Sequence, residues 1–428
     1  MFSPSSFLAF PLLAALPGTF ASFADFGIPS SSATVNVKAF HVVDFTLANL
    51  TGAFFSPVLP GRESVTLPMH AFLLEHQPSG KLFMFDLAMR NDPQNLTPAF
   101  AAFFTGGIAT TNPDPFKDIT QLLTEGNVSL DSIDTIIWSH THFDHIGDMS
   151  KWPSGRNIIV SSQTNLTLFP DAQGSDLQAS DLNGHNVSQV DLTSSSLVIS
   201  GMNAVDLFND GSFYLLDAPG HLEGHMIGLA RVTPTSFIIL GADTAHNLGV
   251  LRPSGSFQPN NPCPADILSS TTSSISADFF WSANTTPGHF DLLSRTQPLL
   301  AISDLADSFF VDPDAGQLSA AKLSALDADD DFLTLITHDA SLDAAGALPL
   351  FPASLATWQK DGLKEKLAWL FLEEGNPAFL FSPANGNQSD STSLSQCLQA
   401  CHADVYRRSM EPTPRMQRSA GLDWDTLF

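Results

Sequence analysis

Residues 134–148 read Asp-Thr-Ile-Ile-Trp-Ser-His-Thr-His-Phe-Asp-His-Ile-Gly-Asp, and the rest of the chain can be interpreted outward from them. The apolar centre of this stretch is typical of a buried strand, and the strand ends abruptly in His140, His142, Asp144 and His145. Three imidazoles and a carboxylate are costly to bury together unless a cation organises them. The cluster therefore predicts a metal site; the alternative is a set of solvated loop histidines.

The segment Ser-His-Thr-His-Phe-Asp-His, from Ser139 to His145, resembles the metal-binding signature of the metallo-β-lactamase-fold hydrolases. In that family the first two histidines hold one metal ion, and the aspartate and third histidine hold a second. The resemblance, closest to the acyl-homoserine-lactonase-like dinuclear zinc hydrolases, extends over residues 34–380. It implies an α/β fold, an αβ/βα four-layer sandwich of two mixed β-sheets with helices on the outer faces.

The family draws three further ligands from later strand ends, and this chain supplies them in order. His221 lies in a Pro-Gly-His-x-x-Gly-His element, Asp243 follows the apolar run 236–240, and His338 follows the apolar run 332–336. By the resemblance, Asp243 bridges the two ions. The first ion then takes His140, His142 and His221, and the second takes Asp144, His145 and His338.

Two other histidines occur in similar contexts but are given different roles. His225 closes the same Pro-Gly-His-x-x-Gly-His element, and we interpret it as a packing or supporting residue because one strand end rarely offers two imidazoles to one ion. His289 follows a second Pro-Gly pair that lacks a preceding strand, so it is interpreted as loop or pocket wall.

The predicted donors define the chemistry. Imidazole nitrogen and carboxylate oxygen without thiolate suit zinc, and manganese or iron can occupy the same set. Two zinc ions about 3.5 to 4 Å apart would share a water acidic enough to provide hydroxide, which would attack a carbonyl carbon. Asp144 or His246 is placed to deliver the proton to the leaving group. The resembling lactonases carry a tyrosine at the position of His246.

A lactone or a related ester is the leading substrate class, because the ligand set is all His and Asp and the 34 phenylalanines can line an apolar pocket. The alternatives within the fold are a phosphotriester (organophosphate) hydrolase, a thioesterase or a lactamase. A catalytically silent binding protein that holds metal for structure is a further alternative. Variable loops decide specificity in such folds, so the substrate cannot be named from the motifs.

Composition excludes some partners. The chain has 428 residues, and 18 basic against 44 acidic side chains give a net charge of −26. Such a surface repels phosphate backbones and anionic lipids. We therefore expect a small-molecule partner, no nucleic acid and no stable membrane association.

The amino-terminal segment predicts export. Residues 7–16 form an apolar core of signal-peptide length, followed by small residues that permit cleavage after Ala21 or Ala24. We expect a signal peptide over residues 1–24, a hydrolase domain over 25–381 and a tail over 382–428, in a secreted glycoprotein. Seven Asn-x-Ser/Thr triplets support this expectation, at Asn49, Asn95, Asn127, Asn165, Asn186, Asn284 and Asn387.

The three cysteines have two interpretations. Cys263 can form a disulfide with Cys397 or Cys401, which the oxidising compartment favours. Alternatively, Cys397 and Cys401 can bind a metal together with His402. The disulfide is preferred, and its pairing stays open.

Four further segments complete the expected organisation. Strands over 71–76 and 81–86 predict a hairpin, and the resemblance places its last residue, Asp86, beneath the metal site. Residues 115–125 predict a helix. The polar stretch 165–196 is expected to be an insertion over the active-site side, and residues 355–374 an amphipathic closing helix.

Overall fold

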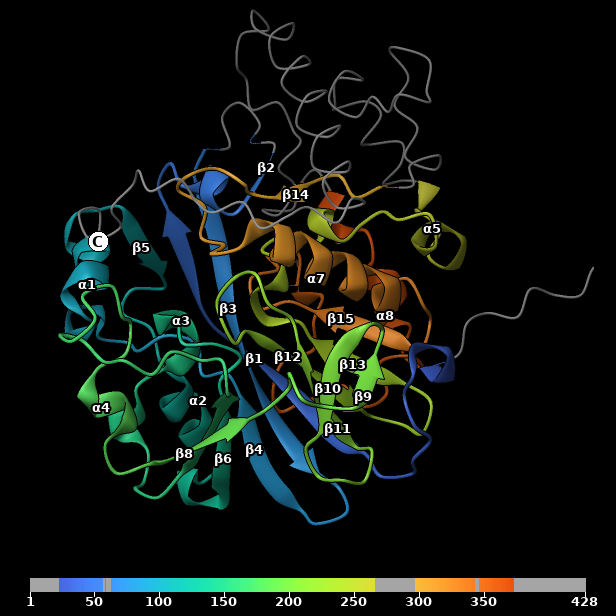
Figure 1. Cartoon of the computed structure of the whole chain (residues 1–428), viewed down its shortest axis with the longest axis horizontal. Helices are drawn as coiled ribbons and strands as arrows, with labels where there is room; N and C mark the ends of the chain where they lie inside the picture. The colour runs from blue at the N-terminus through green and yellow to red at the C-terminus, as the bar shows by residue number, and fades with distance from the viewer. Residues whose placement is uncertain (1–22, 57, 59–62, 266–296, 343–345, 373–428) are drawn as a thin grey trace, which may run out of the picture.

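The computed structural model describes residues 23–56, 58, 63–265, 297–342 and 346–372. These parts form two large β-sheets packed face to face, with helices on their outer sides (Figure 1). The predicted α/β sandwich of two mixed sheets is confirmed. Outside the described residues lie most of the expected signal peptide, the expected tail, His289, and the expected disulfide or metal partners Cys397, Cys401 and His402.

The first sheet has seven strands in the order β5-β1-β3-β4-β6-β7-β8. The strands are β1 (Val35–Leu47), β3 (Val65–His76), β4 (Lys81–Phe85), β5 (Ala109–Asn112), β6 (Ile133–Ile137), β7 (Asn157–Ser161) and β8 (Asn186–Val190). Strands β5, β1, β3 and β4 are antiparallel neighbours, whereas β4, β6, β7 and β8 run parallel. The predicted hairpin is the β3–β4 pair, in which Phe72 lies opposite Phe85.

The second sheet has six strands in the order β15-β13-β12-β11-β10-β9. The strands are β9 (Leu197–Ile199), β10 (Met202–Asp206), β11 (Phe213–Asp217), β12 (Met226–Arg231), β13 (Phe237–Leu240) and β15 (Phe332–Leu335). All neighbours are antiparallel except β13 and β15, which run parallel and so end at the same edge. A separate pair joins β2 (Phe55–Ser56) to β14 (Ala301–Ile302).

One of the two hydrophobic cores lies between the two sheets. Phe72 and Phe83 from the first sheet and Phe213 and Leu215 from the second are buried in one cluster. The rings of Phe83 and Phe213 meet edge to face, with centroids 5.3 Å apart. Burying each such side chain contributes about 1.5–3 kcal/mol, so this layer is what joins the sheets.

Helices cover the outer faces, with α1 to α4 beside the first sheet and α7 beside the second (Figure 1). The described α-helices are α1 (Pro98–Thr105), α2 (Ile119–Glu125), α3 (Phe143–Ile146), α4 (Ala179–Leu182), α5 (Phe257–Asn260), α7 (Pro313–Asp327) and α8 (Leu363–Leu367). The described 3-10 turns are η1 (Phe23–Phe26), η2 (Thr51–Ala53), η3 (Pro93–Asn95), η4 (Leu130–Ser132), η5 (Met149–Lys151), η6 (Ala242–Thr244), η7 (Leu248–Val250) and η11 (Leu370–Leu372). No described helix has the length and apolar character needed to cross a bilayer.

The helix expected over 115–125 is shorter than predicted. It begins at Ile119 because the Asp118 side chain accepts a hydrogen bond from the Gln121 amide, and the Gln121 side-chain oxygen accepts one from the Asp118 amide. This capping box satisfies donors at the helix start and fixes its first turn.

Two other expectations were wrong. The polar stretch 165–196 is not simply an insertion, because it contains α4 and the edge strand β8, which pairs with β7. The closing helix is interrupted, since Gly362 has a φ of +62° and only α8 and η11 follow it in the described residues. A left-handed residue ends the right-handed helical path, and glycine adopts that conformation without steric cost.

Candidate metal centre

All seven predicted ligands lie together at the edge where β6, β11, β13 and β15 end. The loop after β6 and helix α3 carry His140, His142, Asp144 and His145, and later strand ends add His221, Asp243 and His338. The side chains are buried, apart from a partial exposure of His142. Four distant chain segments therefore deliver one compact set of donors.

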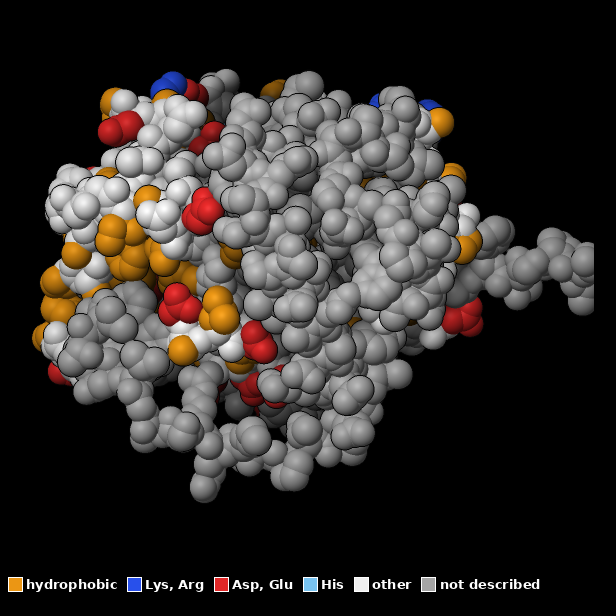
Figure 2. Space-filling view, turned by 90° about the horizontal axis from the view of Figure 1, so that it is seen from above, with side chains coloured by type: hydrophobic (Ala, Val, Ile, Leu, Met, Phe, Trp, Pro, Cys, Tyr) orange, Lys and Arg blue, Asp and Glu red, His pale blue; other side chains and the backbone are white. Residues whose placement is uncertain are grey.

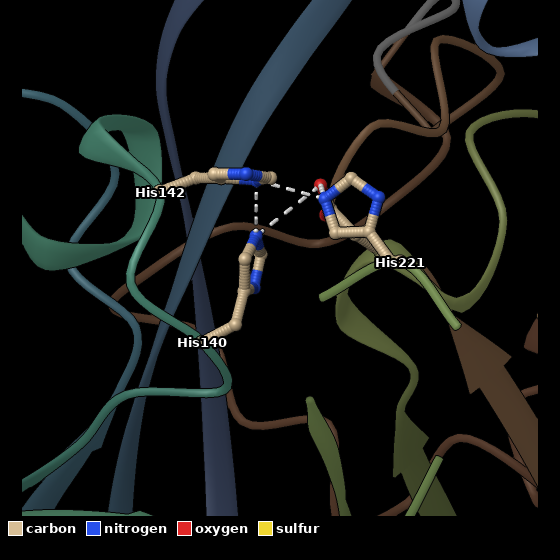
Figure 3. Close-up of side chains that lie close together, drawn as sticks. His140, His142 and His221 are labelled. Atoms are coloured by element: carbon tan, nitrogen blue, oxygen red, sulfur yellow. Dashed lines mark hydrogen bonds and ion pairs between the residues drawn. The ribbon is translucent and has the colours of Figure 1, made fainter. Parts of the chain in front are cut away.

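The first group consists of His140, His142 and His221, whose rings point toward one another (Figure 3). His142 Nδ1 is 2.9 Å from His140 Nε2 and 2.8 Å from His221 Nε2. Asp243 Oδ2 lies 3.2 Å from His221 Nε2 and 3.8 Å from His140 Nε2. Three nitrogens and one oxygen thus surround a common point.

The second group consists of Asp144, His145 and His338. His338 Nε2 is 3.4 Å from Asp144 Oδ2, and His145 Nε2 is 3.9 Å from Asp144 Oδ1. The other oxygen of the shared carboxylate, Asp243 Oδ1, lies 3.1 Å from His145 Nε2 and 3.3 Å from His338 Nε2. Asp243 therefore presents one oxygen to each group.

The spacing fits two metal ions. Donors bound tetrahedrally to one zinc ion at 2.0–2.1 Å lie about 3.3 Å from each other, close to the separations observed here. His145 Nε2 and Asp243 Oδ1 are buried 3.1 Å apart, yet neither makes a hydrogen bond in the described part of the chain. Both atoms are therefore placed to bind a shared cation.

Electrostatics divide the histidines. Burial and the neighbouring imidazoles hold the pKa values of His140 and His142 well below the usual range, and burial lowers the pKa of His221 to about 4. Burial also opposes charge on His145, but the carboxylates of Asp243 and Asp86 outweigh it and raise that pKa well above the usual value. The first group is therefore neutral and ready for a cation, whereas His145 carries a proton in the metal-free protein.

This difference predicts proton release on metal uptake. A raised folded-state pKa means that charged His145 stabilises the metal-free fold below its unfolded pKa of about 6.5, and that this contribution is lost as pH rises through the folded pKa. A metal ion must displace the same proton, so affinity should rise with pH. Titration calorimetry at pH 7 in two buffers of different ionisation enthalpy should show release of about one proton or more. Heats independent of the buffer would contradict this expectation.

Asp86 supports the cluster from below, as expected. Its Oδ1 accepts a hydrogen bond from the Ser139 amide at 2.7 Å, and its Oδ2 lies 2.8 Å from Ser139 Oγ and 2.9 Å from His145 Nδ1. The bond to Nδ1 leaves His145 Nε2 facing the donors. A carboxylate in this position fixes both the tautomer and the ring orientation of a ligand histidine.

His225 supports Asp243 rather than joining the donors. Its Nδ1 donates to the Ala218 carbonyl at 2.9 Å, and its Nε2 accepts the Asp243 amide at 3.1 Å. The residue before Asp243, Ala242, has a φ of +42°, an unfavourable left-handed conformation for a residue with a side chain. His225 thus helps to hold the strained turn that orients the Asp243 carboxylate toward the two donor groups.

Two supporting residues were missed by sequence reasoning. His70 Nδ1 donates to the Thr337 carbonyl at 2.8 Å and so fixes the backbone just before His338. Asp176 Oδ2 accepts the Phe143 amide at 2.6 Å, which anchors the start of α3. Neither residue lies in a recognised motif. The only signal in the sequence was that each is a polar residue within a segment that becomes buried.

His246, the second predicted proton donor, lies against Asp243, with Nε2 3.1 Å from Oδ2. Phe54 packs on its ring with centroids 4.7 Å apart. Phe54 and the adjacent Phe55 are both buried in the hydrophobic core. The proton-donor role of His246 stays a prediction.

A two-sheet sandwich with His and Asp donors gathered at its strand ends defines a metal-dependent hydrolase. The family model described as the metallo-beta-lactamase superfamily matches residues 70–231. The metallo-hydrolase mfmC of Annulohypoxylon moriforme is 35% identical over 364 residues, which cover 82% of this chain and 90% of that protein. The chain belongs to the metallo-β-lactamase superfamily.

Two further similarities add detail. The gamma-lactamase FDB1 of Fusarium pseudograminearum is 32% identical over 373 residues, covering 82% of this chain and 84% of that protein. A crystal structure of a quorum-quenching N-acyl homoserine lactone lactonase aligns with a TM-score of 0.47 and 15% identity, over 76% of this chain and 99% of that one.

Proposed function

We propose that this protein is a secreted dinuclear zinc hydrolase that opens a small, apolar lactone or a related ester. The observation that carries the proposal is the Asp243 carboxylate, which presents Oδ2 to His221 at 3.2 Å and Oδ1 to His145 at 3.1 Å. One carboxylate shared between two histidine groups is the arrangement that holds two ions next to each other.

Bound divalent ions would supply Lewis acidity toward a carbonyl and an acidic water at neutral pH. The chain's own residues bind and orient. His140, His142 and His221 would hold one ion, Asp144, His145 and His338 the other, and Asp243 both. Two divalent ions and the two carboxylates of Asp144 and Asp243 leave a net positive charge, which would stabilise an oxyanion forming on the substrate. Zinc is our choice of metal, with manganese or iron as alternatives, because all donors are nitrogen or oxygen.

Asp144 is the proton carrier in this proposal. Its side chain keeps 11% exposure, whereas that of His246 keeps 1%. A carboxylate at the accessible rim can take a proton from the attacking water and return it to the departing alkoxide. Positioned acid–base groups of this kind contribute about 10²- to 10⁴-fold to a rate.

The surroundings favour an apolar substrate. Phe143 lies between His142 and Asp144 in the chain, and its ring packs near Phe100 and Phe104 of α1, with centroids 5.2 and 6.5 Å away. Helix α1 is largely apolar and has no fully buried residue. Hydrophobic side chains gather on the same side of the molecule in the view from above (Figure 2). These apolar side chains beside the metal loop favour a substrate with an aliphatic or aromatic group.

A γ-lactam is the second candidate substrate. The observation that favours it is the similarity to a protein named gamma-lactamase over 82% of this chain. A lactam leaves through nitrogen, which needs a proton more than an alkoxide does, and Asp144 is available to supply it.

A substrate panel tests the proposal. Zinc-loaded protein should open γ-lactones with apolar substituents faster than γ-lactams, β-lactams, thioesters or phosphotriesters, and activity should disappear on chelation and return with zinc. Elemental analysis should find close to two ions per chain. Faster turnover of γ-lactams than of γ-lactones would identify the protein as a lactamase, the second candidate. Two tightly held ions without turnover of any substrate would support the silent binding protein.

Export belongs to the same proposal. The five acceptor asparagines within the described residues are all exposed, at Asn49, Asn95, Asn127, Asn165 and Asn186. Each can accept a glycan without unfolding the chain. Amino-terminal sequencing of protein recovered from the medium should begin after Ala21 or Ala24, and a chain still beginning at Met1 would refute the signal peptide.

A further inference from the structure

His246 faces the metal centre and not the outside. Its side chain is 1% exposed, and the ring contacts Phe54 and Phe310 with centroids 4.7 and 5.5 Å away. On another side it stacks on His338, with centroids 5.3 Å apart and planes 4° from parallel. Aromatic residues therefore cover the ring, and its Nε2 is directed at Asp243 Oδ2, 3.1 Å away.

The position of His246 matches that of His221. Both Nε2 atoms lie near the same oxygen, since His221 is 3.2 Å and His246 3.1 Å from Asp243 Oδ2. Both rings pack against Phe310, with centroids 5.0 and 5.5 Å away. In neither does Nδ1 make a hydrogen bond in the described part of the chain. Two imidazoles thus approach one carboxylate oxygen in the same way, and one of them already belongs to the donor set.

We propose that His246 is an additional metal ligand, which binds through Nε2 one of the two ions that Asp243 would share. The inference rests on the two-ion site of the proposed function. The possible ligand atoms of Asp243, His246 and His338 lie within 4.8 Å of one another, so His246 belongs to a third buried group of donors around the same carboxylate. The centre then has six imidazoles in place of five.

The two possible roles of His246, as a metal ligand or as a proton donor to the substrate, predict different results when the residue is replaced. A ligand retains metal, so its removal should weaken binding at one of the two positions by at least about 10- to 100-fold, the range seen when even an indirect partner of a ligand is lost. A residue that only donates a hydrogen bond to a leaving group should change turnover and leave metal affinity as it was. Metal binding therefore separates the two roles without any substrate.

The experiment combines a structure with a competition assay. A crystal structure of the full zinc-loaded protein is expected to show His246 Nε2 about 2.0–2.1 Å from an ion. Chelator competition should then show the loss of affinity at one position in His246→Ala and full affinity in Phe54→Leu. The Phe54 variant is the matched control because it disturbs the same ring contact but removes no polar atom.

The outcomes are distinguishable. Two bound ions with His246 Nε2 more than about 3 Å from both would overturn the inference and leave the proposed function intact. Equal affinity in the wild type and His246→Ala would also overturn it. Fewer than two ions in the wild type would instead remove the dinuclear function. If His246→Ala does not fold, the wild-type distance alone decides.

Discussion

Asp243→Ala is expected to abolish catalysis and to loosen both metal ions. The carboxylate is the shared element of the centre, with Nε2 atoms of His145, His221, His246 and His338 all within 3.3 Å of its oxygens. Removing it takes one ligand from each ion. We expect activity to fall at least about 10³-fold, the upper range for loss of a single oxyanion-stabilising donor, because two ions are displaced.

Three measurements test this expectation. Metal content should fall from about two ions per chain to below one after dialysis against a weak chelator. Circular dichroism should still report a folded chain, because Asp243 lies beyond the end of β13 and takes no part in the strand pairing of either sheet. Asp217→Asn is a suitable control, since Asp217 ends β11 but contributes no atom to the described donor groups. An Asp243→Ala protein that keeps two ions and full activity would exclude Asp243 as the bridge.

Asp86→Asn is expected to have the second largest effect, on stability as well as metal affinity. The change keeps the shape of the side chain but replaces one acceptor oxygen by a donor. The fully buried Asp86 carboxylate accepts hydrogen bonds from Ser139 and His145. In the variant, the new side-chain amide N–H would point at one of these donors. Breaking a buried charged pair from one side costs about 3–5 kcal/mol. Loss of a carboxylate that orients a ligand histidine lowers metal affinity about 10- to 100-fold.

Urea denaturation of the metal-free protein and chelator competition measure the two effects separately. Asp134→Asn is the control variant for both measurements, because Asp134 lies on the strand that precedes the metal-binding motif. The Asp134 carboxylate is 70% exposed and only 3.8 Å from Arg156, so its loss should change the free energy of unfolding by less than about 1 kcal/mol. If Asp86→Asn unfolded at the same urea concentration as the wild type and bound metal equally well, Asp86 would have no supporting role.

Local sequence was sufficient for the strands that carry the donors. The short apolar runs before His140, Asp243 and His338 each became the buried part of a strand. Periodicity is a local property, and the order of strand ends is kept by any chain of this fold. The ligand set and the two-sheet architecture were predicted from the resemblance of the metal-binding signature to the metallo-β-lactamase-fold hydrolases.

Local sequence did not predict the secondary structure correctly where a glycine conformation or pairing with a distant segment determined the course of the backbone. The apolar spacing of residues 355–374 favoured one helix, but Gly362 at φ +62° and the hydrogen bond from the Leu355 amide to the Val37 carbonyl replaced its first half with turns. The polar stretch before Ser196 likewise became an edge strand because β7 offered it a ladder of hydrogen bonds. Tertiary pairing outweighs weak intrinsic preference in both cases.

By itself the sequence determined which atoms can bind metal and at which strand ends they emerge, because residue type and hydrophobic pattern are local. Only the tertiary structure decided how those atoms are aimed. His70 meets Thr337 across 267 residues, Asp86 meets Ser139 across 53, and His246 turns toward Asp243 because Phe54 and Phe310 cover its other side. Hydrogen bonds to ligand histidines and packing against their rings join residues distant in the chain, and no periodicity of the chain encodes such contacts.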